Sequence, residues 1–178
     1  MKKIILAVSA LVLGTVAAHA ADGTITITGK VTDKTCTINA NAAKDFTVAL
    51  PTVSTSSLPA VGATAGRTPF TIKLTQCSVG NVATYFEPGS TVDFGSGNLL
   101  NAVATGNATN VQVQLLGDNN LPIKIQSSGG TTQTNSQTVN VAQANGSADL
   151  NYYAQYYATG AASAGNVSTS VKYTIIYP

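Results

Sequence analysis

Two cysteines are the only side chains in this sequence whose types and number point to a specific chemical step. Cys36 and Cys77 are the only cysteines, and a chain that enters an oxidising compartment commonly joins such a pair in a disulfide. The bond would close a loop of about 40 residues, which the chain-entropy model credits with about 4 kcal/mol of stability. Two unpaired buried thiols remain the alternative at this point.

The other reactive residue types argue against catalysis. The single histidine, His19, lies in the N-terminal leader, so the exported chain has none for a catalytic triad or a metal site. The carboxylates are scattered singly, with no visible pair for general acid and base work. They are Asp22, Asp33, Asp45, Glu87, Asp93, Asp118 and Asp149. We expect no enzymatic activity, no cofactor and no bound metal.

The N-terminus has the pattern of a signal peptide. A positive start at Met1-Lys2-Lys3 precedes an apolar run from Ile4 to Ala18, and Ala18-His19-Ala20 fits a signal-peptidase site. We therefore expect residues 1–20 to be removed and the mature chain to begin at Ala21. The apolar run is shorter than the roughly 20 residues of a spanning helix, so we expect export.

The charge balance excludes a nucleic-acid-binding role. The chain has nine basic and seven acidic residues, and two of the basic ones, Lys2 and Lys3, belong to the leader. The mature chain is therefore neutral, and Arg67 is its only arginine. Charged residues make up 9% of the sequence, where about 25% is usual. A basic patch for nucleic acid is therefore not expected.

Both ends of the mature chain are patterned as β-strands. Near the start, Ile25, Ile27 and Val31 alternate with polar residues, and Gly29 takes the remaining inward position. The last residues form a matching apolar row of Val171, Tyr173, Ile175 and Tyr177. A strand without a hairpin partner must pair with another sheet edge. Two such strand ends predict a subunit that polymerises.

The rest of the chain favours an all-β fold. Helical periodicity is nearly absent, and short alternating runs are separated by turn-forming clusters, which is typical of a sandwich. We expect strands at residues 29–38, 46–50, 68–74, 83–86, 91–94, 110–116, 123–126, 137–141, 149–158 and 168–177, and a surface loop at 52–66. The tyrosines at 152, 153, 156 and 157 are better explained by a strand with tyrosine on both faces than by sugar stacking.

Five sequence features together resemble the major pilins of type 1 fimbriae, which are assembled by the chaperone–usher route. The resemblance covers essentially the whole mature chain. The features are Gly23-x-Ile25-x-Ile27-x-Gly29-x-Val31 followed by Cys36, Phe70-x-Ile72-x-Leu74-x-x-Cys77, Thr109-Asn110-Val111-x-Val113-x-Leu115, Tyr156-Tyr-Ala-Thr-Gly160 and the penultimate Tyr177.

The resemblance implies an incomplete immunoglobulin-like sandwich, the pilin fold, that lacks its last strand. Residues 21–32 would be an N-terminal donor strand, and residues 33–178 the fimbrial domain. The missing strand would leave a hydrophobic groove between the strand after Gly29 and the strand ending at Tyr177. Gly29 would lie where the groove admits no Cβ atom. A periplasmic chaperone would grip the C-terminal strand and the terminal carboxylate of Pro178.

The function implied is a structural subunit that polymerises by donor-strand exchange. Identical subunits would join head to tail at an outer-membrane usher and form a fimbria at the cell surface, for adhesion and biofilm formation. Host surface glycans would be contacted through the assembled fimbria, if at all. The alternative is a minor or adhesin-type subunit of the same fimbria that itself binds a host glycan.

Overall fold

The computed structural model describes residues 23–38, 43–102, 104–127 and 132–178. The chain divides into two compact units, Met1–Val31 and Thr32–Pro178, which are described separately. The described residues of the first unit, 23–31, contain neither helix nor strand. The expected leader, residues 1–20, lies outside the described part of the chain.

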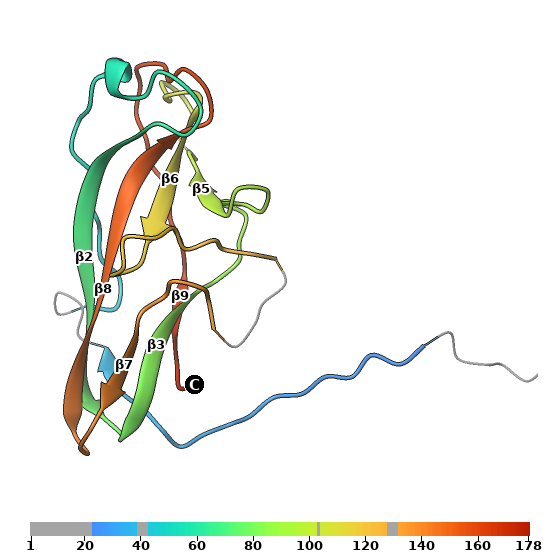
Figure 1. Ribbon diagram of the computed structural model, residues 1–178, viewed down its shortest axis with the longest axis vertical. Helices are drawn as coiled ribbons and strands as arrows, with labels where there is room; N and C mark the ends of the chain where they lie inside the picture. Colours follow the sequence, from blue (N-terminus) through green and yellow to red (C-terminus); the bar gives the residue numbers. More distant parts are fainter. Residues whose placement is uncertain (1–22, 39–42, 103, 128–131) are drawn as a thin grey trace, which may run out of the picture. The chain divides into compact units, whose positions relative to one another are not determined.

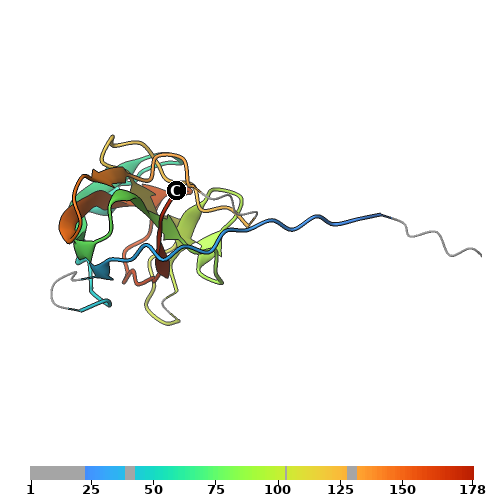
Figure 2. The ribbon, with the colours of Figure 1, turned by 90° about the horizontal axis from the view of Figure 1, so that it is seen from below.

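The second unit is a sandwich of two antiparallel sheets (Figure 1). The larger sheet has the strand order β1-β2-β8-β6-β5-β4 and the smaller one the order β7-β3-β9. The larger sheet is formed by β1 (Thr37–Ile38), β2 (Thr64–Cys77), β4 (Val92–Asp93), β5 (Asn98–Leu100), β6 (Val111–Leu116) and β8 (Gly146–Ala158). The smaller sheet is formed by β3 (Gly80–Phe86), β7 (Thr138–Val141) and β9 (Tyr173–Ile176), and a short 3-10 helix, η2, spans Thr55–Ser57. Figure 2 views this unit from below, nearly along the strands.

Alternating apolar residues on the long strands form the core between the sheets. In β2, Ile72 and Leu74 are fully buried, and in β8, Leu150 and Tyr152 lie opposite Ile72 and Phe70. These positions share one face because successive strand residues point to opposite sides of a sheet. The core therefore depends on the register of the β2–β8 pair.

A row of aromatic rings runs from the smaller sheet to the larger sheet and back. Phe86 of β3 contacts Tyr152 of β8 at a centroid distance of 5.2 Å, and Tyr152 contacts Phe70 of β2 at 5.6 Å. Phe46 continues the row, at 6.0 Å from Phe70 and 6.3 Å from Tyr173 of β9. Such tilted and edge-on pairs add stability beyond area burial. The row ends at the C-terminal strand.

Several expected strands are shorter than predicted. The strand expected at residues 29–38 is reduced to Thr37–Ile38, and the one expected at 168–177 to Tyr173–Ile176. Residues 46–50 keep their alternation but belong to no strand, because they form no ladder with a neighbour. The expected loop at 52–66 contains η2, and β2 begins within it at Thr64.

Two further differences come from pairing that the sequence pattern does not reveal. Residues 123–126 are not a strand, although Ile123 and Ile125 are buried. Instead of forming a ladder, the backbone amide of Ile123 donates to the carbonyl oxygen of Leu115 at 2.9 Å. The backbone amide of Ile125 donates to that of Gly97 at 3.1 Å. Strand β5 was not expected, because its residues Asn98–Leu100 do not alternate visibly.

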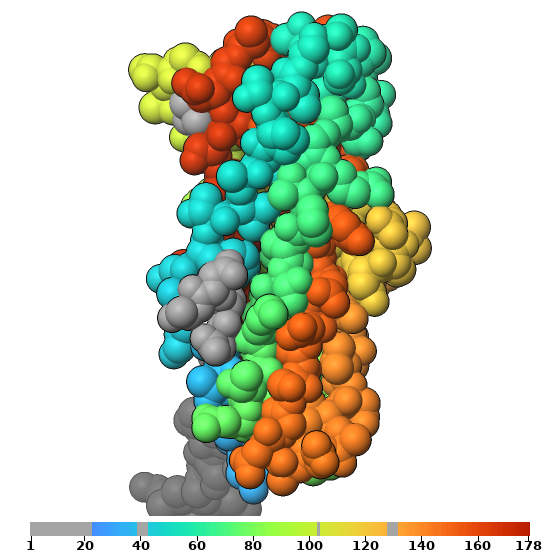
Figure 3. Space-filling model, turned by 90° about the vertical axis from the view of Figure 1, so that its left-hand side faces the viewer, coloured from blue at the N-terminus to red at the C-terminus, as the bar shows by residue number. Residues whose placement is uncertain are grey.

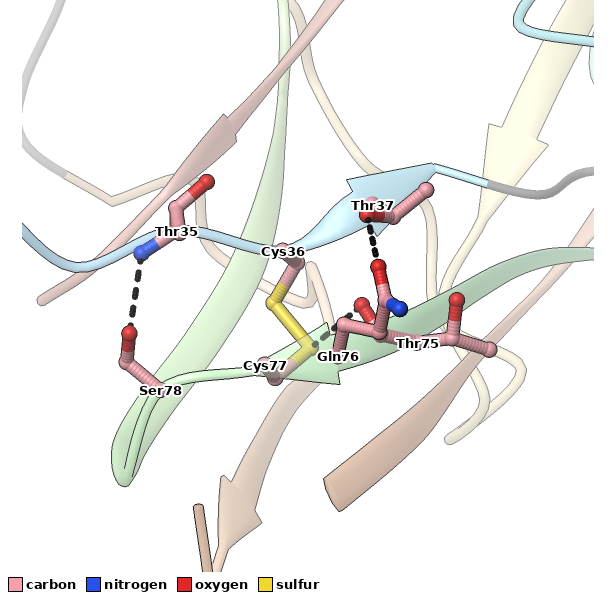
Figure 4. Close-up of a disulfide and its surroundings, with 7 residues drawn as sticks. All are labelled: Thr35, Cys36, Thr37, Thr75, Gln76, Cys77 and Ser78. Carbon is pink, nitrogen blue, oxygen red and sulfur yellow. Dashed lines mark hydrogen bonds between the residues drawn. A yellow bond between two sulfur atoms is a disulfide. The ribbon is translucent and has the colours of Figure 1, made fainter. Parts of the chain in front are cut away.

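The disulfide between Cys36 and Cys77 fixes the start of the domain to the end of β2 (Figure 4). Thr35 and Ser78 flank it and exchange hydrogen bonds, with the Ser78 amide donating to the Thr35 carbonyl at 2.9 Å and the Thr35 amide donating to Ser78 Oγ at 3.3 Å. The Thr75 carbonyl oxygen lies 3.8 Å from Cys77 Sγ, which is a contact only, because a disulfide sulfur has no proton to donate. Since β1 pairs with β2 at only two positions, the disulfide is the main link here.

Replacing both cysteines by alanine is expected to lower the free energy of unfolding by about 4 kcal/mol, because the closed loop spans a sequence separation of 41. Urea unfolding of the purified protein measures this difference. Reduced wild-type protein is the control and should match the double variant. Equal stability of the oxidised and reduced wild-type protein would contradict the prediction.

Candidate strand-acceptor seam

Strand β9 has one free edge. It pairs with β3 through four residue pairs, from Phe86 with Tyr173 to Ala83 with Ile176, and with no other strand of the described chain. The expected C-terminal row, Val171, Tyr173, Ile175 and Tyr177, packs against the core but is only half-buried. Pro178 is exposed at the end of the row. The strand therefore has apolar side chains and backbone groups that lack a neighbour on one side.

Residues 43–51 form a second incomplete element. Phe46, Val48 and Leu50 alternate with exposed residues and pack half-buried against the core. Among the described residues, this segment makes no backbone–backbone hydrogen bond. Because backbone N–H and C=O groups need partners when they are removed from water, burial of this segment requires a neighbouring strand. We call this segment, together with the row from Val171 to Tyr177, the seam.

Phe46 places the segment between the two sheets. Its ring contacts Phe70 of β2 on one side and Tyr173 of β9 on the other. The hydroxyl group of Tyr173 donates a hydrogen bond of 2.7 Å to the carbonyl oxygen of Lys44. Burial, and then the nearby carboxylate of Asp45, raise the pKa of Tyr173 above its ordinary value. Tyr173 therefore remains a neutral donor at physiological pH.

An open surface pocket of about 400 Å³ lies between residues 46–49 and β2. Figure 3 shows this side of the body, where the cyan segment lies along the green strand β2. The pocket is lined by Phe46, Thr47, Val48, Ala49, Thr68, Pro69, Phe70, Thr71 and Lys73. Segment 43–51 thus lies between β2 and β9 without a backbone ladder to either strand.

The seam has the properties of an acceptor for an extended apolar strand. An added strand would cover the half-buried rows and would provide partners for the free edge of β9. The described residues contain no cluster of three or more histidine, cysteine or carboxylate side chains that could hold a metal. Within the same residues, no helix is long and apolar enough to cross a membrane.

The N-terminal extension supplies side chains of the matching kind. Ile25, Ile27 and Val31 are 90%, 89% and 99% exposed. A Cβ atom added to Gly29 would meet no atom within 4 Å. These residues therefore make no packing contact within their own unit, and their apolar character has no structural explanation there.

One wall of the seam differs from the sequence-based expectation. We expected the strand after Gly29 to form the groove edge, but its remaining strand residues, Thr37–Ile38, pair with β2. The contacts with Tyr173 come instead from Lys44 and Phe46. The alternation of Phe46, Val48 and Leu50 predicted an extended segment there but gave no sign of which edge it would approach.

Comparisons with known proteins agree with this architecture. Residues 50–178 match the family model described as "FimA: Type-1 fimbrial protein, A". The chain is 66% identical to the major fimbrial subunit SMF-1 of Stenotrophomonas maltophilia strain K279a, over 90% of this chain and 95% of that protein.

Solved structures show the same fold at lower sequence identity. A subunit from the structure of a chaperone–usher pilus superimposes with a TM-score of 0.60 at 21% identity, over 89% of this chain and 96% of that chain. The P pilus rod subunit PapA gives a TM-score of 0.58 at 18% identity, over 80% of this chain and 99% of that chain. The chain therefore belongs to the FimA family of type-1 fimbrial proteins and is a structural subunit of a cell-surface fimbria.

Proposed function

We propose that this subunit polymerises by donor-strand exchange, with residues 21–32 of one copy inserted into the seam of the next. Residues 33–178 then form the accepting domain. The proposal rests on one observation. The extension has apolar side chains without contacts in its own unit, and the seam has apolar rows and a strand edge without a partner.

The two elements are complementary in kind. Burying Ile25, Ile27 and Val31 would contribute about 1.5 to 3 kcal/mol for each side chain. The same strand would provide backbone partners for the free edge of β9, at about 1 kcal/mol net for each hydrogen bond. The inserted strand also covers the half-buried rows of the accepting subunit. Each joint therefore completes the fold of the subunit that accepts the strand. The joint is then durable without a covalent bond.

Before assembly the seam needs a temporary occupant. A periplasmic chaperone fits this role, bound along Val171 to Tyr177 and at the carboxylate of Pro178. An outer-membrane usher would then exchange it for the extension of an identical subunit, which gives a head-to-tail homopolymer. The identity to a major subunit favours this abundant structural role over a minor, glycan-binding one. Adhesion, biofilm formation and any contact with host glycans would be properties of the assembled fimbria.

Ile27→Asp should turn the subunit into a chain terminator. The variant keeps its seam and accepts a strand, but its own extension would bring a carboxylate into an apolar site. Lost apolar burial and desolvation of the charge together should weaken the joint at least about 100-fold. Added at a small fraction to wild-type subunits, the variant should shorten the fibres seen by electron microscopy.

Thr28→Asp is the matched control, since Thr28 would lie on the opposite face of the inserted donor strand. Both residues are exposed, so neither variant should change the unfolding midpoint of the isolated subunit. Fibres of normal length with Ile27→Asp, or equal shortening with Thr28→Asp, would refute the proposed joint.

Gly29→Leu should block joint formation without affecting the free subunit. Nothing lies within 4 Å of an added Cβ in the extension, so any steric cost must arise in the joint. Assembly rates measured by light scattering should fall at least tenfold for Gly29→Leu and change little for the outward-facing Lys30→Leu. Normal assembly of Gly29→Leu would show that Gly29 does not set the register of the donor strand.

A further inference from the structure

The only arginine of the chain is aimed by a β-bulge. The β2–β8 register shifts between Ala65 and Thr68, so Gly66 and Arg67 together lie opposite Gln155. Gly66 has a φ of +67°, a left-handed conformation that favours glycine. The bulge turns Arg67 to the face of the larger sheet that carries Gln155, opposite to the core.

Four amide side chains lie buried on this outer face. Gln155 belongs to β8, Gln112 and Gln114 to β6, and Asn98 to β5. On β6 the two glutamines alternate with the core residues Val113 and Leu115. The four amides are only 4–8% exposed. Buried amides are costly unless they are hydrogen-bonded, so their partners decide their effect.

The amides form a single directed chain of hydrogen bonds. Arg67 Nε donates to Gln155 Oε1 at 2.9 Å, and Gln155 Nε2 donates to Gln114 Oε1 at 2.9 Å. Gln114 Nε2 donates to Asn98 Oδ1 at 3.4 Å, and Asn98 Nδ2 donates to Gln112 Oε1 at 3.1 Å. Each amide accepts from the previous member and donates to the next.

The chain of hydrogen bonds ends at a carboxylate side chain. Gln112 Nε2 donates to Asp93 Oδ2 at 2.7 Å. This bond, followed by those from the Gly95 amide and the Ser96 hydroxyl, lowers the pKa of Asp93 below its ordinary value. A guanidinium group can only donate and a carboxylate can only accept, so the two ends impose one orientation on all four amides.

We propose that Arg67 and Asp93 form a clamp that holds the larger sheet in register from β2 to β4 and couples two residues that do not touch. Removing either end takes away the charged partner of the terminal amide and leaves a buried polar group unsatisfied. The clamp lies on the face opposite to the core. It therefore acts whether or not the seam is filled, and it does not rest on the proposed polymerisation.

A double-mutant cycle tests the clamp in the purified protein. Arg67→Met and Asp93→Ala should each raise the unfolding equilibrium constant about tenfold, and the double variant should also raise it about tenfold, not a hundredfold. Asp93→Asn keeps an acceptor oxygen and should retain most of the wild-type stability. Arg67→Met combined with Asp149→Ala is the control, since Asp149 is not a member of the hydrogen-bonded amide chain. The effects of these two substitutions on the unfolding equilibrium constant should multiply.

Side-chain amide exchange measured by NMR provides a second readout, which also serves if a variant is too unstable for the cycle. In Asp93→Ala the exchange of the Gln155 side-chain amide, at the other end of the chain, should rise at least about tenfold. Asp149→Ala should leave it unchanged. The clamp would be overturned if the effects of Arg67→Met and Asp93→Ala on the unfolding equilibrium constant multiplied. It would also be overturned if faster side-chain amide exchange in Asp93→Ala were confined to Gln112.

Discussion

The structure depends on a β-sandwich that is open along one side. Within the described part of the chain, the free edge of β9 and segment 43–51, which forms no backbone ladder, leave backbone groups without partners next to half-buried apolar rows. Neither defect can be repaired alone, because burying the apolar rows also removes the backbone groups from water. An extended apolar strand repairs both at once. This shared requirement connects the fold of the subunit to its membership of a polymer-forming family.

The two faces of the larger sheet have different tasks. The core face packs Ile72, Leu74 and Leu150 against the smaller sheet, and it includes the residues that reach the seam. The outer face carries the directed amide chain from Arg67 to Asp93. The disulfide fixes the start of the domain to β2. Since the amide chain lies on the face opposite to the core, it can stabilise the subunit before its core is completed.

Period-2 patterns predicted much of the fold, including the all-β class, the long strands and the C-terminal row, and the cysteine count predicted the disulfide. The patterns failed where a strand depends on a distant neighbour. Phe46–Leu50 has the right alternation, but no ladder forms on either side of it. Strand β5 was missed because Asn98 is buried by the amide chain, and Arg67 looked unremarkable because nothing local shows that the bulge at Gly66 aims it at Gln155. The alternation of the extension predicted a strand, and the family resemblance implied that it is a donor strand, but the wall of the seam could be located only in the structure.

Amide hydrogen exchange of the free subunit and of the assembled fibre tests the central claim most directly. If the extension of a neighbour fills the seam, the amides of residues 24–31, 45–51 and 173–177 should exchange at least about 100-fold more slowly in the fibre. The buried amides of β6 and β8 should change far less. Equal exchange of the seam in both states, with new protection elsewhere on the domain, would contradict the account.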